Sequence, residues 1–125
     1  MTKKSPRVRE LLLATEFFPI VFNKSKTCTV RTGHRNVRPG LMTIRSADGS
    51  IVADGEDSVT VRVTGVKHTT LGELTMRDLL AEGMDATAFD YNFERMLYAF
   101  WADMGKFYPD ITLESPVTVI NFKLV

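Results

Sequence analysis

The stretch from Ser58 to Thr64 constrains the fold more than any other part of the chain. Its three valines, at positions 59, 61 and 63, alternate with hydroxyl and arginine side chains. Successive side chains of a β-strand point to opposite faces of a sheet, so this alternation predicts a strand with one buried face. Val66 is expected to extend the strand past Gly65.

Further strands are expected on both sides of this segment. They are expected in the segment from Lys24 to Arg31, where Cys28 and Val30 are the alternating apolar positions, and at residues 41–45, 51–53 and 117–124. Asp48-Gly49 indicates a hairpin turn before the short strand at 51–53. The run Leu11-Leu12-Leu13 fits a strand or a buried helical segment equally well, because a short apolar run does not separate the two.

Two helices are expected in the second half of the chain. Thr75-Met76-Arg77-Asp78 resembles a capping box with Asp in place of Glu, and it predicts a short helix that stops at Gly83. Asp85 is the expected cap of a longer helix. The apolar residues of that helix follow the spacing of one buried stripe, namely Phe89, Phe93, Met96, Leu97, Phe100 and Met104. Strands and helices in this arrangement, without strand–helix–strand repeats, predict an α+β fold built on a small, mostly antiparallel β-barrel.

Length and composition favour one globular domain spanning residues 1–125. Hydrophobic residues make up 44% of the chain and charged residues 25%, and no apolar run is long enough to span a membrane. No signal-peptide core follows the N-terminus, so a cytoplasmic protein is expected. The single Cys28 and the isolated His34 and His68 have no metal-ligand spacing, so neither a metal nor another cofactor is expected.

Cations are concentrated in the segment from residue 24 to residue 38, which contains no acid. They are Lys24, Lys26, Arg31, Arg35 and Arg38. Such a segment suits a phosphate-bearing partner such as RNA, and it equally fits a solvated basic loop. Charge alone does not distinguish these two interpretations.

An ordered set of motifs resembles an ASCH domain, and the resemblance runs from about Leu11 to Val125. The motifs are Lys26-Thr27-x-Thr29-Val30-Arg31, Pro39-Gly40, Leu74-Thr75, Glu82-Gly83-Met84, Tyr108-Pro109 and Val119-Ile120-x-Phe122. The chain is most similar to the small bacterial members that act as N4-acetylcytidine amidohydrolases. This resemblance implies a PUA-like β-barrel with two to three flanking helices, and a modified nucleoside or RNA as the partner.

The resemblance also implies roles for three residues. Thr29 would be the nucleophile, Lys26 the base and Glu82 the acid that protonates the leaving amine. Lys24, Arg31, Arg35 and Arg38 are the candidate substrate or phosphate contacts. Two positions depart from the family pattern: Lys24 stands where Gly is common, and Leu41 stands where Asp is common.

Strand geometry adds a condition to this assignment. Strict alternation would place Lys26 on the face of Cys28 and Val30, opposite Thr29. The assignment therefore requires Lys26 to lie before the regular strand, or a bulge between the two residues. Arg31 shares the face of Thr29 and is expected to hold a carbonyl or phosphate, or to form a salt bridge.

The alternative from a different class is an RNA-binding module without catalysis. In that interpretation the five cations form a phosphate track, and Tyr98 or Trp101 supplies a stacking surface.

Overall fold

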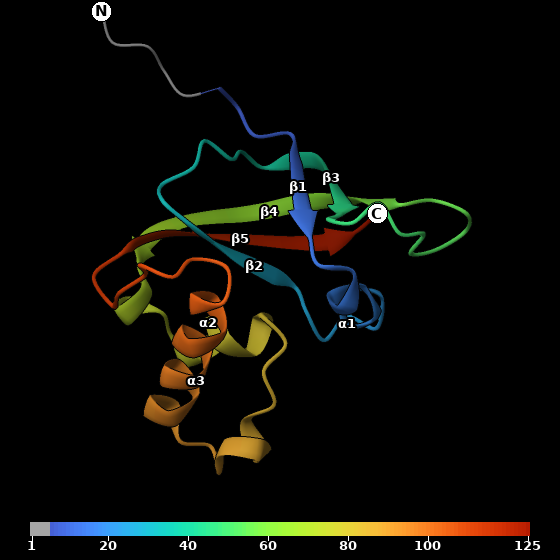
Figure 1. Ribbon diagram of the computed structural model, residues 1–125. Coiled ribbons are helices and arrows are strands. Elements are labelled where there is room, and N and C mark those ends of the chain that lie inside the picture. Colours follow the sequence, from blue (N-terminus) through green and yellow to red (C-terminus); the bar gives the residue numbers. More distant parts are fainter. Residues whose placement is uncertain (1–5) are drawn as a thin grey trace, which may run out of the picture.

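Five strands form a single sheet in the order β1-β3-β4-β5-β2 (Figure 1). The computed structural model describes residues 6–125. The strands are β1 Glu10–Leu13, β2 Cys28–Thr32, β3 Gly40–Ser46, β4 Ser58–Thr70 and β5 Pro116–Leu124. β1 runs parallel to β3, and the other three neighbouring pairs are antiparallel. The sheet is therefore mixed and mostly antiparallel.

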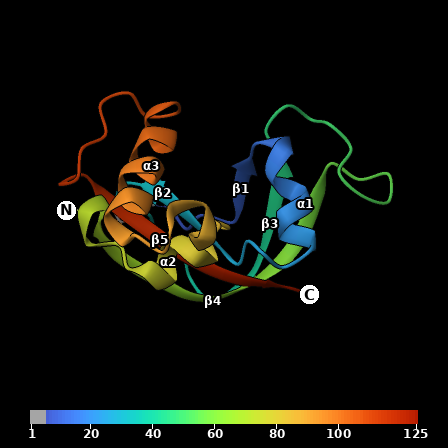
Figure 2. The same cartoon turned by 90° about the horizontal axis from the view of Figure 1, so that it is seen from below.

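The sheet is strongly curled and forms an open half-barrel. Seen from below, it makes a trough with α2 and α3 over one end and β1, β3 and α1 at the other (Figure 2). β1 and β2 are the two edges of the sheet and are not neighbours in it. The prediction of an α+β fold on a small, mostly antiparallel barrel is confirmed, and the barrel remains open between these two strands.

Three α-helices accompany the sheet: α1 Phe18–Phe22, α2 Met76–Ala81 and α3 Phe93–Gly105. The predicted capping box at the start of α2 is present, with the Thr75 side chain accepting from the Asp78 backbone and the Asp78 side chain accepting from the Thr75 backbone. In the part of the chain that the structure describes, no helix combines the length and the apolar character needed to cross a bilayer.

The prediction that Asp85 caps the long helix is wrong. Asp85 instead caps a 3-10 turn at Ala86–Phe89, and Asn92 caps α3 by accepting a hydrogen bond from the Arg95 backbone. The reason is conformational, because Asp90 and Tyr91 have positive φ angles of 53° and 56°. Two consecutive left-handed residues stop the first turn and restart the helix at Phe93.

The prediction of a short return strand at residues 51–53 is also wrong. β3 pairs with β4 in a register that runs from Gly40–Val63 to Arg45–Ser58. Residues 51–56 form only an isolated bridge between Ala53 and Glu56. The long alternating segment offers β3 six consecutive partners, which a three-residue strand cannot match, so the intervening residues become an extended loop.

The curl of the sheet divides the core in two. One apolar cluster lies between the sheet and helices α2 and α3 and includes Cys28, Leu79 and Met96. The other lies beneath β1 and α1 and includes Phe18 and Ile120. β4 contributes Val61 and Val63 to the second cluster. It shifts register against β5 between Val63 and Gly65 and continues to Thr70, which confirms its expected extension past Gly65. A bulge of this kind increases the local bend of a strand.

Candidate functional site

A cavity of about 540 Å³ occupies the gap where the half-barrel remains open. It draws residues from both edge strands, with Leu12 and Leu13 on β1 and Thr29, Val30 and Arg31 on β2. α1 and α3 supply apolar residues to its walls, and the end of α2 supplies Glu82. A volume of this size suits a small organic ligand.

Lys26 reaches the cavity from the turn that connects α1 to β2. Its backbone N–H donates to the Ile20 carbonyl at 2.9 Å, and the next residue, Thr27, donates to the Ala81 carbonyl at 2.7 Å. These bonds attach the turn to α1 on one side and to α2 on the other. The Lys26 side chain is only 4% exposed, so its ammonium group faces the cavity instead of bulk water.

Glu82 lies at the C-terminal cap of α2, as the sequence predicts. Its backbone N–H donates to the Asp78 carbonyl at 3.0 Å. Gly83 then ends the helix with a φ of +104°, and a Cβ on it would lie 3.0 Å from the Ile20 side chain. This tight turn holds the Glu82 carboxylate against the Lys26 segment.

The two oxygens of Glu82 have different partners. Oε2 forms an ion pair with the Lys26 Nζ atom. Oε1 accepts a hydrogen bond of 2.8 Å from the Val30 backbone N–H, on the edge strand β2. Charge-assisted bonds of this kind are stronger than neutral ones. A carboxylate in the last turn of a helix is disfavoured by the helix dipole, and these two contacts explain why one is kept there.

Thr29 and Arg31 lie two residues apart on β2 and share a face of the strand. The Arg31 Nε–H donates to the Thr29 hydroxyl oxygen at 3.1 Å. Burial lowers the pKa of the Arg31 guanidinium, while Tyr108 and Glu82 oppose that shift. A cation beside the hydroxyl favours the alkoxide that a nucleophilic threonine needs to become.

The condition set by strand alternation is met, because β2 begins at Cys28. Lys26 therefore lies ahead of the regular strand, where alternation does not govern the direction of its side chain. Lys26, Thr29 and Glu82 all line the cavity. The structure thus brings the three proposed reacting residues, and Arg31, to one place.

The remaining predicted contacts lie elsewhere. Lys24 is exposed in the turn before Lys26, and Arg38 is exposed in the loop after β2. Arg35 donates from Nε to the Thr32 carbonyl at 2.9 Å. None of these three lines the cavity, so their predicted role in phosphate binding remains a prediction.

The loop after β2 that carries Arg35 and Arg38 is attached to the sheet. The Thr118 hydroxyl accepts from the Arg35 backbone at 2.8 Å and donates to the Gly33 carbonyl at 2.6 Å. His34 and His68 stack with ring centroids 4.8 Å apart. His34 Nε2 lies 3.1 Å from the Thr69 carbonyl oxygen on β4, and His68 Nε2 lies 3.0 Å from the Arg35 carbonyl oxygen in the loop. These contacts hold the basic loop against β4.

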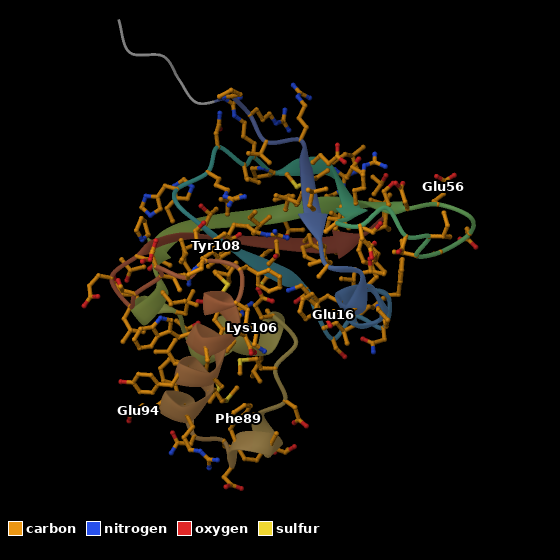
Figure 3. All side chains as sticks on the ribbon, viewed as in Figure 1. Glu16, Glu56, Phe89, Glu94, Lys106 and Tyr108 are labelled. Carbon is orange, nitrogen blue, oxygen red and sulfur yellow. The ribbon has the colours of Figure 1, made fainter. Side chains whose placement is uncertain are left out.

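Several residues were not recognised from the sequence as cavity residues. α3 contributes Phe100, Asp103 and Met104, and Phe107 follows two residues after the helix ends, at the i, i+3, i+4 and i+7 spacing of one helix face. The same spacing is typical of a buried core stripe, so it does not by itself reveal a ligand cavity. Figure 3 marks Phe89 before α3 and Tyr108 after it, and both also line the cavity.

Cys28 is not one of the candidate reacting residues. Its side chain is fully buried, and its Sγ–H contacts the Asp78 carbonyl at 3.6 Å. Burial and, secondarily, Glu82 raise the pKa of the thiol, so the reactive thiolate is disfavoured. Within residues 6–125, no three His, Cys, Asp or Glu side chains are grouped so that they could hold a metal ion.

Comparison with known proteins finds likeness in structure alone. No family model matches the sequence, and no curated protein matches it. Protein EF3133 from Enterococcus faecalis V583, described under the family DUF984, superposes with a TM-score of 0.61 at 14% identity, over 93% of this chain and 76% of that one. An ASCH domain from Lactobacillus crispatus JV V101 gives a TM-score of 0.60 at 10% identity, over 92% and 79%. The chain therefore has an ASCH-like, PUA-like fold, and at these identities the likeness concerns the fold alone.

Proposed function

We propose that this protein is an amidohydrolase that cleaves N4-acetylcytidine to cytidine and acetate. The observation that carries the proposal is the ion pair between Lys26 and Glu82 in the cavity that Thr29 also lines. These are the residue types and positions to which the sequence resemblance assigns the reaction. The ASCH-like fold is consistent with that resemblance.

In the proposed first step, the Thr29 hydroxyl oxygen attacks the acyl carbon and the Lys26 amine takes the hydroxyl proton. A tetrahedral intermediate forms. The bond between the acyl carbon and N4 then breaks while Glu82 gives a proton to the departing amine. Cytidine leaves, and the acetyl group remains as an ester on Thr29.

In the second step, water attacks the ester carbon while the Glu82 carboxylate left by the first step takes one of its protons. The bond between the acyl carbon and the Thr29 oxygen then breaks, and the Lys26 ammonium returns its proton to that oxygen. Acetic acid leaves and ionises to acetate in water. Arg31 is the cation positioned to stabilise negative charge on the oxygen atoms of the reacting centre, since it already contacts the Thr29 hydroxyl.

The Lys26–Glu82 contact supports this division of roles. The reaction needs a neutral amine as base and a protonated carboxyl group as acid. Moving one proton from Lys26 Nζ to Glu82 Oε2 produces both forms together and leaves the net charge of the pair unchanged. Such a transfer needs direct contact between the two groups, and the ion pair supplies it.

The cavity favours a nucleoside over a polynucleotide as the substrate. Apart from Lys26, Thr29, Arg31, Glu82, Asp103 and Tyr108, its lining is apolar. Leu12 and Phe107 line it and are more than half exposed, at 55% and 58%. Apolar walls suit a nucleobase and its acyl group, whereas an RNA backbone needs several cations along its path.

The test is to incubate the purified protein with N4-acetylcytidine and follow cytidine release by chromatography. Thr29→Val preserves the shape of the side chain and removes the nucleophile, so kcat should fall by about 10³-fold or more. Thr29→Ser should retain measurable turnover. Thr27→Val is the matched control, because Thr27 is exposed and does not line the cavity. Absence of turnover by the unmodified protein, or full activity of Thr29→Val, would refute the proposal.

A second candidate function is RNA binding without catalysis, and a second groove favours it. This groove of about 490 Å³ is lined by polar residues, including Thr27, Thr64, Lys67, Arg77 and Asn121. Lys67 is paired with Asp78 at 2.7 Å. The Arg77 side chain is exposed and makes no ion pair or hydrogen bond with any residue from 6 to 125. The proposed stacking residues, Tyr98 and Trp101, line neither this groove nor the cavity.

RNA binding predicts an affinity that falls steeply with salt concentration. It also predicts that Arg77→Ala weakens binding while Thr29→Val does not. An affinity for single-stranded RNA that is insensitive to salt and to Arg77→Ala would exclude this candidate.

A further inference from the structure

The face of α3 that lines the cavity contains one charged position. Phe100 and Met104 are buried, and Asp103 lies between them in the sequence. Phe107 continues the stripe just after the helix ends. Water solvates the Asp103 carboxylate, so it needs no partner within the protein and remains available to a ligand in the cavity. The only partner of Asp103 among residues 6–125 is Lys106, at 3.4 Å, and both side chains are exposed, at 64% and 73%. An exposed pair of this kind contributes little to stability.

The other charged groups of the cavity already have partners. Lys26 pairs with Glu82, Glu82 also accepts from the Val30 backbone, and Arg31 contacts Thr29. These groups come from the turn before β2, from β2 itself and from the C-terminal cap of α2, whereas Asp103 comes from the last turn of α3. Lys106 follows at the end of that helix (Figure 3). A ligand in the cavity therefore meets paired polar groups from the β2 segment and α2 and, on α3, a separate, solvent-exposed carboxylate.

We infer that Asp103 is a substrate-binding residue that accepts hydrogen bonds from the vicinal diol of a ribose. An ionised carboxylate offers two acceptor oxygens and no donor, and a 2′,3′-diol offers two hydroxyl donors. This inference rests on the proposed function and specifies its substrate as a neutral ribonucleoside. A negative charge at the same place disfavours a phosphate group, which agrees with the absence of cations other than Lys26 and Arg31 from the lining.

The experiment compares N4-acetylcytidine with its 2′,3′-dideoxy analogue, which has the same base and acyl group but no diol. The unmodified protein should prefer the ribonucleoside by about tenfold or more in kcat/KM, mainly through KM. Asp103→Ala should abolish this preference. The substitution suits a helix, because alanine is the best helix former. Lys106→Gln is the matched control: it removes the ion pair but keeps the carboxylate, and it should retain the preference.

A binding measurement separates this inference from the proposed reaction. Cytidine and 2′,3′-dideoxycytidine are titrated into the unmodified protein and into Asp103→Ala, and affinity is measured by calorimetry or by changes in amide chemical shifts. Weaker binding of the dideoxy compound to the unmodified protein, with no difference for Asp103→Ala, supports the diol contact even if neither acetylated compound is hydrolysed. Equal binding of the two nucleosides, no binding of either, or an unchanged preference in Asp103→Ala would overturn it.

Discussion

The Nζ atom of Lys26 forms an ion pair with Oε2 of Glu82, although the two residues lie 56 positions apart in the chain. Their side chains are only 4% and 11% exposed. The same carboxylate accepts the Val30 backbone N–H at the edge of the sheet. One side chain therefore joins α2 to β2 and to the turn before it, so the site and the local fold depend on the same contacts.

Removing one member of this pair is expected to destabilise the protein strongly. Glu82→Gln keeps the size of the side chain but leaves the Lys26 ammonium buried without a counter-charge, which costs about 3–5 kcal/mol of unfolding free energy. Urea denaturation followed by circular dichroism measures the loss. The double variant Lys26→Met, Glu82→Gln should recover much of it, because no uncompensated charge remains. Additive losses in the double variant would contradict this account.

Asp78 is expected to contribute to the loss of stability in acid. Burial raises the pKa of this carboxyl group, but hydrogen bonds from the Lys67 side chain and from Thr75 outweigh burial and hold the pKa below its usual value. Its contribution is therefore complete above the unfolded-state pKa of about 3.9. That contribution is lost as the pH falls through the lower pKa of the folded state. Part of the Lys67 contribution is screened, because that side chain is 43% exposed.

The check is the urea midpoint at pH 5.5 and at pH 3. Asp78→Asn should be less stable than the unmodified protein at pH 5.5, and the difference should shrink at pH 3. Asp110→Asn serves as the control, since exposed Asp110 makes no ion pair or hydrogen bond with any residue from 6 to 125. A difference between Asp78→Asn and the unmodified protein that is constant with pH would refute the prediction.

Gly83 is expected to be required for both folding and activity. Its φ is +104°, and a Cβ there would lie 3.0 Å from the Ile20 Cδ1 atom and 3.6 Å from the Lys26 Cβ atom. Gly55 has a φ of +75° and no atom within 4 Å of its Cβ position. Both Gly→Ala variants incur the backbone cost of a left-handed residue, about 1–2 kcal/mol. Gly83→Ala should lose more stability than Gly55→Ala, and only Gly83→Ala should reduce turnover. Equal effects of the two substitutions would show that the crowding is unimportant.

Cys28 is expected to be unreactive in the folded protein. Burial raises the pKa of its thiol, and the side chain has no exposed surface. The thiol should therefore react with a disulfide reagent such as dithionitrobenzoate only as fast as the protein opens, and immediately in denaturant. Rapid stoichiometric reaction under native conditions would contradict the buried position. The result also distinguishes a threonine nucleophile from a cysteine nucleophile. A nucleophilic cysteine would be alkylated under native conditions and activity would be lost, whereas a buried, unreactive Cys28 should leave activity unchanged after treatment with the same reagent.

Much of the fold follows from local patterns. The alternating valines of β4, the closing strand β5 and the capping box of α2 all lie where the sequence predicts them. Two predictions fail for different reasons. Residues 51–53 form no strand beside β3 because the longer β4 pairs with it. Asp85 does not cap the long helix because the left-handed residues Asp90 and Tyr91 interrupt the chain before that helix begins.

Part of the candidate site is also predictable from the sequence, and part is not. The resemblance points to Lys26, Thr29 and Glu82. Strand alternation requires either that Lys26 precede the regular strand or that a bulge separate it from Thr29, and the structure has the first arrangement. The face of α3 that completes the cavity is not recognisable in the sequence, because an apolar stripe at helical spacing looks the same whether it meets a core or a cavity. Lys24, Arg35 and Arg38 are close to Lys26 in sequence, yet the turn and the loop that carry them place them outside the cavity.

The sequence by itself determined the positions of β3, β4, β5 and α2, because side-chain periodicity, capping residues and turn residues act over a few neighbouring positions. It also indicated the residue types of the site through their resemblance to a known pattern. Only the tertiary structure decided that the sheet remains open between β1 and β2, and that a cavity lies in the opening. It also decided that a carboxylate from α2 meets an ammonium 56 residues away. These features depend on how the sheet curls and on which distant surfaces pack together, and no local pattern encodes either.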